Sequence, residues 1–305
     1  MKVVAVIVTY NGMQWIERCV ESLLGSAMPL DIVIIDNQST DGTFEFLRSR
    51  YENRIELRQL PENLGFGRAN NIGIKIGFDN QCDFIFLVNQ DVYIEPDTTS
   101  KLVEAQVRQA EFGIVSPLHL NGTGNALDRN FLNYITEDQC PGLISDLFLG
   151  KISPLLYRTD FVNAAAWLIS RKCIAAVGGF NPSFLHYGED ENYVQRAELH
   201  GFKTGICTTT TIRHDREQRK RSLHYKDDRY AYKRSLTTKM SYPHLAFKYN
   251  KERKRLYSEL FKSALTLNGS RFTKWKNRLV IFRSMDVALL EKNRKQSLKR
   301  EPSFL

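Results

Sequence analysis

The amino-acid sequence predicts an α/β fold in which helices flank a single, mostly parallel central sheet, followed by a helical appendage. In the first third of the chain, short apolar and β-branched runs alternate with segments of helical periodicity, which is typical of a parallel sheet with crossover helices. Residues 216–305 then contain 25 Lys and Arg against 8 Asp and Glu. We therefore expect one domain over residues 1–215 and a basic helical region over residues 216–305.

The predicted strands are runs in which nearly every residue is apolar or β-branched, as buried strands require. They cover residues 3–8, 31–35, 55–57, 84–88, 113–117, 161–170 and 206–212. The predicted helices place apolar residues three or four positions apart, with turn and capping residues at 39–43 before the second of them. They cover residues 13–24, 44–48, 65–78, 97–110, 171–177 and 193–200.

Two regions follow different patterns. Between residues 118 and 158, glycine, proline and asparagine break every period, so we expect a long excursion with short elements. Beyond residue 215, Tyr, Leu and Phe recur at three- and four-residue spacings, which predicts helices.

Composition places the chain among soluble globular proteins. Of its 305 residues 42% are hydrophobic and 25% charged, and no apolar run approaches the roughly 18 to 20 residues that span a bilayer. The first residues read as a strand rather than as a secretion signal, so we expect a cytoplasmic protein. The five cysteines never form a Cys-x-x-Cys spacing, which argues against zinc and disulfides and for free thiols.

The charge is unevenly distributed. Residues 216–305 carry a net charge of +17, whereas the preceding residues, with 18 basic and 26 acidic side chains, carry −8. The basic region would suit an anionic membrane surface, through Arg216, Arg219, Lys220, Arg221 and the basic and apolar stretch 249–261. Solvated helices with outward-facing Lys and Arg explain it equally well. Nucleic acid is disfavoured, because the chain lacks an aromatic platform or zinc module and the remaining body is acidic.

Polar clusters follow four predicted strands, at the point where each strand ends: Thr9-Tyr10-Asn11, Asp36-Asn37, Asn89-Gln90-Asp91 and Arg213-His214-Asp215. Strand ends in a parallel sheet share an edge, and ligands of open α/β sheets bind there. A carboxylate such as Asp91 can hold a divalent cation and, through it, nucleotide phosphates, although taken alone it could equally cap a turn. Asp36 and Thr9 would contact a nucleoside, and Arg68 would add positive charge near a diphosphate.

A fifth cluster, residues 188–191, contains three adjacent carboxylates. Mutual repulsion can raise the pKa of one of them and create a general base. An acidic first helical turn that favours the helix dipole is the alternative. The first strand is not followed by Gly-x-Gly-x-x-Gly, nor is a Walker motif present, which disfavours dehydrogenases and P-loop enzymes.

In their order along the chain, these motifs resemble those of family-2 glycosyltransferases with the GT-A fold, particularly bacterial rhamnosyltransferase-like members. The resemblance covers residues 2 to about 214 and rests on short motifs. They are Val8-Thr9-Tyr10-Asn11, Asp36-Asn37-x-Ser39-x-Asp41-Gly42-Thr43, Asn63-x-Gly65-Phe66, Asn89-x-Asp91, Gly178-Gly179-Phe180 and Tyr187-Gly188-Glu189-Asp190.

The resemblance implies inverting transfer of a sugar, rhamnose or another hexose, from a nucleotide-diphosphate donor to a hydroxyl of a glycan or lipid-linked glycan. It divides the domain into a nucleotide-binding part, residues 1–117, and an acceptor and catalytic part, residues 118–215. It assigns Asp190 as the base, and Asp91 with His214 to Mg²⁺ or Mn²⁺. The implied donor contacts are Thr9, Tyr10, Asn11, Asp36, Asn37, Arg68, Asn89 and Gln90. The implied sugar and acceptor pocket contains Trp167, Tyr187 and Glu189.

Two positions depart from the family pattern. Asn89 stands where the metal motif usually begins with Asp, and Asn192 replaces a frequent carboxylate. Weaker metal binding or an inactive binding module would follow. A sugar-nucleotide nucleotidyltransferase is a rival, but it would need a glycine-rich basic loop after the first strand, where residues 10–13 have none. The sequence is also compatible with a homodimer attached to the inner face of the plasma membrane.

Overall fold

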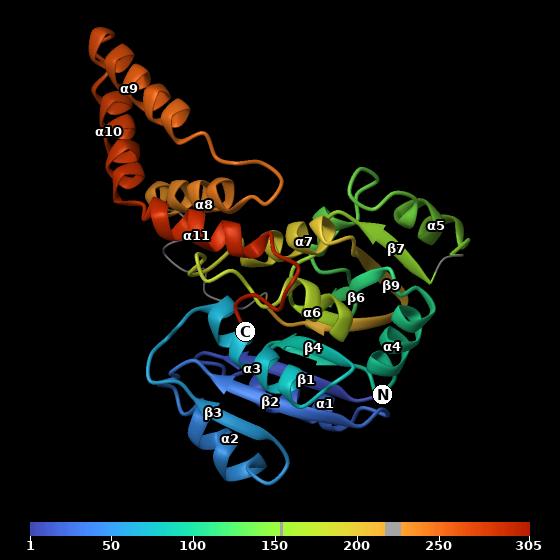
Figure 1. The fold of residues 1–305 in the computed structure, drawn as a ribbon. Helices are drawn as coiled ribbons and strands as arrows, with labels where there is room; N and C mark the ends of the chain where they lie inside the picture. The colour runs from blue at the N-terminus through green and yellow to red at the C-terminus, as the bar shows by residue number, and fades with distance from the viewer. Residues whose placement is uncertain (153–154, 217–226) are drawn as a thin grey trace. The chain divides into compact units, whose positions relative to one another are not determined.

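The structure of the protein, a computed structural model, describes residues 1–152, 155–216 and 227–305. Two compact units divide the chain (Figure 1). Unit 1 is Met1–Arg219 together with Lys299–Leu305, and unit 2 is Lys220–Leu298. Across the described residues, no helix combines the length and the apolarity needed to cross a bilayer.

The first half of unit 1 is a parallel sheet. Strands β1 (Val3–Thr9), β2 (Leu30–Asp36), β3 (Glu56–Gln59) and β4 (Phe84–Asn89) lie in the order β3-β2-β1-β4. Helices α1 (Ile16–Leu24), α2 (Thr43–Tyr51) and α3 (Phe66–Asp79) form the crossovers. Thr9 pairs with Asp36, and Val8 with Asn89, so the ends of β1, β2 and β4 lie at one edge as the sequence predicted.

The second half of unit 1 adds antiparallel strands to this sheet. Strand β8 (Ala166–Ser170) lies antiparallel between β4 and β6 (Phe112–Asn121), and β9 (Lys203–His214) runs parallel to β6. Strands β5 (Val92–Ile94) and β7 (Leu156–Thr159) both pair antiparallel with β9. Strand direction here depends on pairing between distant segments, which apolar runs alone do not encode.

Three further helices of unit 1 are α4 (Thr98–Arg108), α6 (Arg171–Val177) and α7 (Glu189–Leu199). The predicted strand 161–170 begins only at Ala166, because Ala165 donates its N–H to the carbonyl of Asn163 at 2.8 Å in a tight turn. Within the predicted excursion, β6 extends to Asn121, and the short elements η1 (Phe131–Tyr134) and α5 (Leu143–Leu149) follow.

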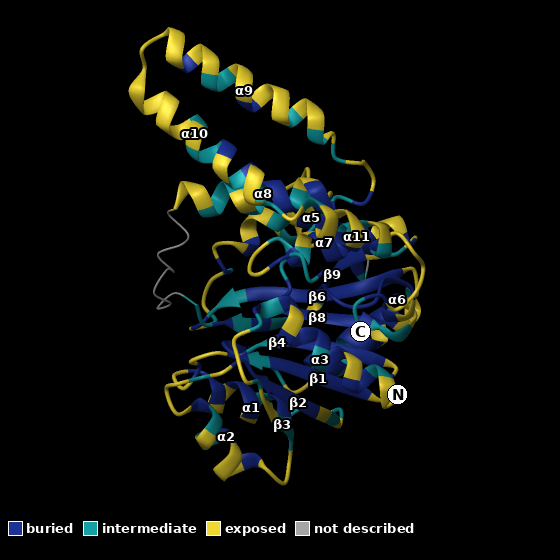
Figure 2. Cartoon of the chain, turned by 60° about the vertical axis from the view of Figure 1, so that its left-hand side comes forward, coloured by how far each residue is buried: buried dark blue, intermediate teal, exposed yellow. Residues whose placement is uncertain are grey.

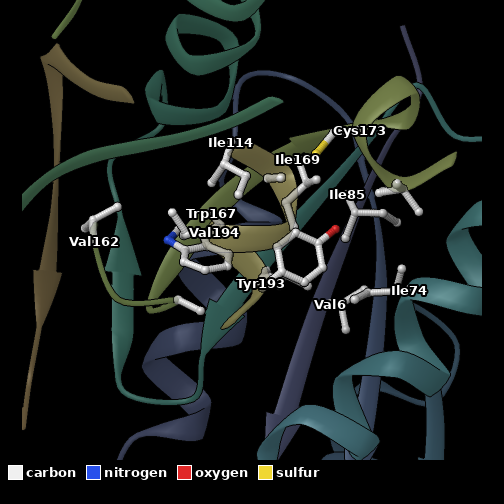
Figure 3. Packing of buried hydrophobic residues seen from close by; sticks show 14 of the residues in the cluster. Val6, Ile74, Ile85, Ile114, Val162, Trp167, Ile169, Cys173, Tyr193 and Val194 are labelled. Atoms are coloured by element: carbon white, nitrogen blue, oxygen red, sulfur yellow. The ribbon is translucent and has the colours of Figure 1, made fainter. Parts of the chain in front are cut away.

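Alternate residues of the central strands belong to two apolar clusters, and Figure 2 shows the strands of the sheet as buried. In one of them Trp167 and Tyr193 pack together among residues from β1, α3, β4 and β8 (Figure 3). All five cysteines lie in the described ranges and are buried and free, as predicted. This double-sided burial explains why the central strands are continuously apolar.

The last seven residues of the chain return to unit 1, a feature that the sequence pattern did not indicate. The carbonyl of Ser303 accepts a hydrogen bond from the N–H of Gly179 at 2.8 Å, and Arg300 donates to the carbonyl of His200 at 3.1 Å. The adjacent Gly178 has φ +79°, and a Cβ atom there would lie 1.9 Å from the Ser303 oxygen. A glycine is therefore required where the terminal segment packs.

Unit 2 is helical, as its periodicity predicted. It contains α8 (Asp228–Ser241), α9 (Tyr249–Leu265), α10 (Gly269–Ser284) and α11 (Val287–Ser297). Its apolar core comprises Leu236, Met240, Leu256, Leu279, Phe282 and Leu290. Arg219, Lys220 and Arg221, which we expected to open a membrane-binding region, lie outside the described residues.

Candidate functional site

Thr9 and Asp36 form a buried pair at the carboxyl ends of β1 and β2. The Thr9 hydroxyl donates to Asp36 Oδ1 at 2.8 Å, and neither residue has exposed surface. Asp36 Oδ2 accepts from the backbone N–H of Ser39 at 3.0 Å and from the Gln59 amide at 3.2 Å. The carboxylate therefore holds the strand end and the following turn in place. Contact of either side chain with a nucleoside stays a prediction.

The loops after β1 and β2 are joined by side chains from both. Asn11, at φ +48°, accepts from the N–H of Thr40 at 2.8 Å and donates its own N–H to the Ser39 hydroxyl at 2.9 Å. Asp41 accepts from the N–H of Met13 at 3.1 Å. Ser39 and Asp41 were read from sequence only as turn residues, yet they determine the position of the first loop.

Gln90 connects the end of β4 to the same loop. Its side-chain amide accepts from the N–H of Tyr10 at 2.9 Å and donates to the Tyr10 carbonyl at 3.2 Å. A Cβ atom at Gly12 would lie 2.3 Å from the Gln90 oxygen, so a side chain there would displace Gln90. The Tyr10 ring remains exposed, which leaves it accessible to a ligand.

Asn37 and Arg68 position neighbouring loops. The Asn37 amide donates to Asn63 at 2.8 Å and accepts from the N–H of Leu64 at 2.8 Å. The Arg68 guanidinium donates to the carbonyl of Pro182 at 2.7 and 3.2 Å. Arg68, predicted to lie near the donor diphosphate, thus ties α3 to the loop that precedes α7 in this structure.

Asp91 and His214 are brought together by the pairing of β5 with β9. Val92 pairs with His214, and the N–H of Asp215 donates to the Asp91 carbonyl at 2.8 Å. His214 Nε2 consequently lies 3.5 Å from Asp91 Oδ1, with 1% and 0% of the two side chains exposed. The register therefore unites two residues that the sequence predicted to share a metal.

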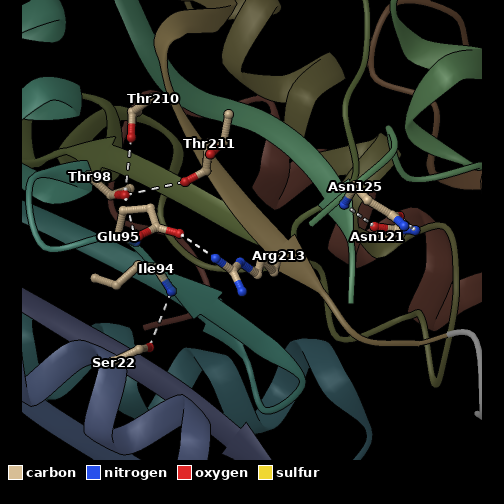
Figure 4. Close-up of polar contacts among 9 residues, drawn as sticks. All are labelled: Ser22, Ile94, Glu95, Thr98, Asn121, Asn125, Thr210, Thr211 and Arg213. Carbon is tan, nitrogen blue, oxygen red and sulfur yellow. Dashed lines mark hydrogen bonds and ion pairs between the residues drawn. The ribbon is translucent and has the colours of Figure 1, made fainter. Parts of the chain in front are cut away.

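A polar network joins β9 to the residues that follow β5 (Figure 4). The Thr98 hydroxyl donates to the Thr211 carbonyl at 3.3 Å and accepts from the Thr210 hydroxyl at 3.1 Å. Arg213 reaches Glu95 at 3.4 Å. These contacts hold the residues after β5 against β9, at the end of the β5–β9 pairing away from Asp91 and His214.

His119, to which the sequence assigned no role, and Arg216, which we expected to contact a membrane surface, adjoin the pair. The His119 ring lies 6.1 Å from the His214 ring and stacks on Phe131 at 4.6 Å. Burial, followed by the charges of His214 and Arg216, lowers the pKa of His119 well below its ordinary value. Arg216 forms a two-point ion pair with Asp128, so the chain beyond β9 is bound to the excursion.

The Asp91–His214 pair fits a divalent cation in its chemistry. Neither ring nitrogen of His214 makes a hydrogen bond within the described residues, and a carboxylate oxygen lies beside one of them. Mn²⁺ accepts carboxylate and imidazole ligands, while Mg²⁺ requires one or two carboxylates plus substrate phosphates. No cluster of three or more His, Cys, Asp or Glu with metal-binding geometry occurs in the described ranges, so phosphate and water would complete the coordination.

Asp190 lies in the first turn of α7, which starts at Glu189 rather than at residue 193 because Asn192 donates its N–H to the Gly188 carbonyl. Asp190 Oδ1 accepts from the N–H of Glu191 at 2.9 Å, and the backbone of Ala164 also hydrogen-bonds its carboxylate. Burial raises the pKa of Asp190 to about 6, against these bonds. Residues 189–191 also form an acidic first helical turn, which was the alternative interpretation of this cluster.

Two consecutive residues, Ala164 and Ala165, connect Asp190 to the end of β4. Its carboxylate is bonded by the backbone of Ala164, and the carbonyl of the next residue, Ala165, accepts from the N–H of Asn89 at 2.9 Å. The base candidate thus adjoins the turn that carries Asp91. Tyr187 is exposed at φ +67°, and Glu189 is buried.

Trp167, predicted to line the sugar and acceptor pocket, belongs to the apolar core in this structure. It has no exposed surface, and its ring packs against Phe180 and Tyr193 at centroid distances of 6.3 and 5.9 Å. The alternation of β8 directs it into the core. Arg196, on α7 after the acidic cluster, is fully buried and donates to Asn192 and to the carbonyls of Val177 and Gly179.

Comparison with known proteins agrees with this arrangement. Residues 4–144 match the model of glycosyl transferase family 2. The chain is 26% identical over 236 residues to the N-acetylglucosaminyl-diphospho-decaprenol L-rhamnosyltransferase of Mycobacterium tuberculosis, covering 68% of this chain and 74% of that protein. It is also 26% identical over 202 residues to the chondroitin synthase of Escherichia coli, covering 64% of this chain and 26% of that one.

Solved structures share the fold at low identity. Staphylococcus aureus TarS 1–349 in complex with UDP superposes with a TM-score of 0.53 at 16% identity, covering 97% of this chain and 91% of that one. GalNAc-T7 with UDP, GalNAc and Mn²⁺ gives 0.62 at 14% identity, covering 99% and 55%.

Proposed function

Because the chain is a family 2 glycosyltransferase with the GT-A fold, we propose that it transfers a sugar from a nucleotide-diphosphate donor to an acceptor hydroxyl with inversion. One observation carries the proposal. The Asp91–His214 pair lies at the turn after β4, and Asp190 is connected to the same turn through its bond with Ala164. The buried Thr9–Asp36 pair lies beside this turn. A cation-binding pair next to a base with a raised pKa suits displacement of a diphosphate by a hydroxyl.

The donor diphosphate would bind where Asp91 and His214 meet. A bound Mg²⁺ or Mn²⁺ would neutralise charge that develops on the leaving diphosphate. The loops after β1 and β2 present the exposed Tyr10 and Asn11 toward solvent, and we assign the nucleoside to them. Mutual hydrogen bonds hold these loops before a ligand arrives, which lowers the entropic cost of binding.

Asp190 would remove the proton from the attacking hydroxyl. With a pKa of about 6 it is ionised at neutral pH, yet it is a stronger base than an ordinary aspartate. Attack from the face opposite the diphosphate inverts the anomeric carbon. Exposed Tyr187, together with Glu189, is assigned to the acceptor side because both flank Asp190 on the same loop and helix turn.

The relatives narrow the substrates that we propose. The mycobacterial protein is named as transferring L-rhamnose to N-acetylglucosaminyl-diphospho-decaprenol, and a TarS structure contains UDP-GlcNAc. We therefore assign a hexose donor, rhamnose or a relative, and a glycan or lipid-linked glycan acceptor in bacterial surface polysaccharide synthesis. The site of action would be the cytoplasmic face of the membrane, where such donors and acceptors meet.

Thermal unfolding in the presence of nucleoside diphosphates tests the proposal. UDP, GDP and dTDP are each added with and without Mn²⁺, to the wild type and to Asp91→Asn. We expect one nucleotide to raise the Tm with Mn²⁺, as binding to the native state requires, and the variant to lose that metal-dependent part. If no nucleotide changes the Tm under either condition, the proposed donor site is wrong.

Asn89 supports a second candidate, an inactive binding module, because an amide supplies no charge to a cation. The enzyme and the binding module differ in whether they release the nucleoside diphosphate from the donor. Metal-dependent release of a nucleoside diphosphate from its sugar conjugate supports the enzyme, whereas binding without any release supports the module.

A further inference from the structure

The turn between α9 and α10 in unit 2 exposes large apolar side chains on both helices and between them. Phe261 and Leu265 near the end of α9 are 65% and 68% exposed, and Leu267 in the turn is 92% exposed. Phe272, on the first turns of α10, is 37% exposed. We define these four residues as the apolar tip. Figure 2 shows this turn as exposed.

The backbone of the turn is strained at Leu267, and the apolar tip lies outside the core of unit 2. Leu267 has φ +50°, a left-handed conformation that a leucine adopts only at a cost. Asn268 follows it and accepts from the N–H of Arg271 at 3.0 Å, which starts α10. Leu256, Leu279 and Phe282 belong to the core of the unit, and the apolar tip is absent from that core. Packing within unit 2 therefore does not explain these four side chains.

Basic side chains surround the apolar tip. Residues 249–284 contain ten Lys and Arg against two Glu. Both glutamates are in ion pairs: Glu252 with Arg255, and Glu259 with Arg271 at 2.8 Å and with Lys262 at 3.5 Å. Lys274 and Lys276 are exposed on α10. Lys276 lies about 6 Å further along the helix than Phe272, from a rise of about 1.5 Å per residue.

We propose that the apolar tip inserts into an anionic lipid bilayer while the surrounding Lys and Arg contact the headgroups. A protein segment at a membrane surface places its apolar side chains about 5–10 Å into the headgroup boundary and its cations at the headgroups. The distance of about 6 Å between the apolar tip and the neighbouring cations matches this arrangement. A second copy of the chain is disfavoured as the occupant, because two strongly positive turns would face each other. The inference rests on the proposed function, since a lipid-linked acceptor lies in a bilayer.

Vesicle binding by the full-length chain tests the inference, with no donor or acceptor present. The tip variant carries Phe261→Glu, Leu265→Glu and Leu267→Glu. The matched control carries Leu245→Glu, Val280→Glu and Leu289→Glu, which are also exposed in unit 2 and introduce the same charge away from the turn. Circular dichroism verifies that both variants keep their helices.

We expect the wild type to sediment with vesicles of phosphatidylcholine and phosphatidylglycerol, and the tip variant to bind at least about tenfold more weakly. The control should bind like the wild type. Leu267→Trp should show blue-shifted emission and quenching by brominated lipids. Equal binding of the tip variant and the wild type, or no binding by the wild type, overturns the inference.

Two further measurements separate the alternatives. Light scattering that shows self-association in the wild type but not in the tip variant would assign the apolar tip to a second copy and overturn the membrane inference. Sugar transfer to a soluble acceptor is measured in parallel. Retained transfer without vesicle binding contradicts this inference alone, whereas vesicle binding without transfer contradicts the proposed function alone.

Discussion

His214 Nε2 lies 3.5 Å from Asp91 Oδ1, and neither side chain reaches solvent by more than 1% of its surface. An aspartate and a histidine meet here because β5 pairs antiparallel with β9 immediately beside them. Side chains of this kind are removed from water only where a partner compensates for the loss. Substitutions of Asp91 and His214 therefore test the proposed site most directly.

Asp91→Asn should raise the Mn²⁺ concentration needed for half-maximal nucleotide binding by at least about tenfold, since even residues that only orient metal ligands contribute that much. His214→Gln should act in the same direction. Isothermal titration with the nucleotide identified by thermal unfolding measures the effect. Asp97→Asn is the matched control, because Asp97 is exposed and pairs with Lys101. An unchanged Mn²⁺ requirement in Asp91→Asn contradicts the assignment.

Asp190→Asn should lower kcat by about a hundred- to ten-thousand-fold, the range of general-base catalysis, while nucleotide binding persists. Glu191→Gln, on the adjacent residue of the same turn, should retain kcat within a few-fold because Glu191 faces solvent. Initial rates of nucleoside diphosphate release measure both variants. Near wild-type turnover by Asp190→Asn would remove Asp190 from the mechanism.

The pH profile reports the same carboxyl group. The deprotonated form of Asp190 is the active one, so activity is present above its pKa of about 6 and should fall tenfold per pH unit below it. Burial is the main cause of the raised pKa, and the charge of Glu191 adds to it. Glu191→Gln should therefore move the acid limb of kcat/KM to lower pH. An acid limb at the ordinary aspartate value of about 4 would contradict this.

Arg196→Leu should destabilise unit 1 by at least about 2 kcal/mol, because it leaves the buried carbonyls of Val177 and Gly179 without their donor. Burial lowers the pKa of Arg196 to about 10, so the lost group is a cation at neutral pH. Urea unfolding followed by tryptophan fluorescence in a Trp275→Phe background reports unit 1. Arg158→Leu, which breaks an exposed pair with Glu198, should cost less than about 1 kcal/mol.

Gly178→Ala should cost about 2–5 kcal/mol, since the new Cβ atom would lie 1.9 Å from the Ser303 oxygen at a residue whose φ is +79°. Gly42→Ala has a similar φ of +91° and open space around it, so it should cost about 1–2 kcal/mol. The same urea assay compares them. In a chain ending at residue 298 the two costs should converge, and an undiminished difference would show that the terminal segment is not responsible.

Local patterns were sufficient to predict much of the fold and part of the site. β-branched runs identified β1, β2 and β4, and apolar spacing identified α1 and α3, because each pattern records which face of an element is buried. Polar residues directly after the strands predicted that Thr9, Asp36 and Asp91 would share an edge. Parallel pairing made that inference valid, since strand ends then coincide.

Other features depended on contacts between distant segments. The antiparallel insertion of β8, the burial of Trp167 and the bonds of Arg68 to the Pro182 carbonyl follow from which segments become neighbours. The return of residues 299–305 to Gly178 has no local signature either. Residue types and their positions along the chain were enough to name the side chains that could do the chemistry. Which of these side chains meet depends on the folded structure, because burial and hydrogen-bond satisfaction are set by partners far along the chain.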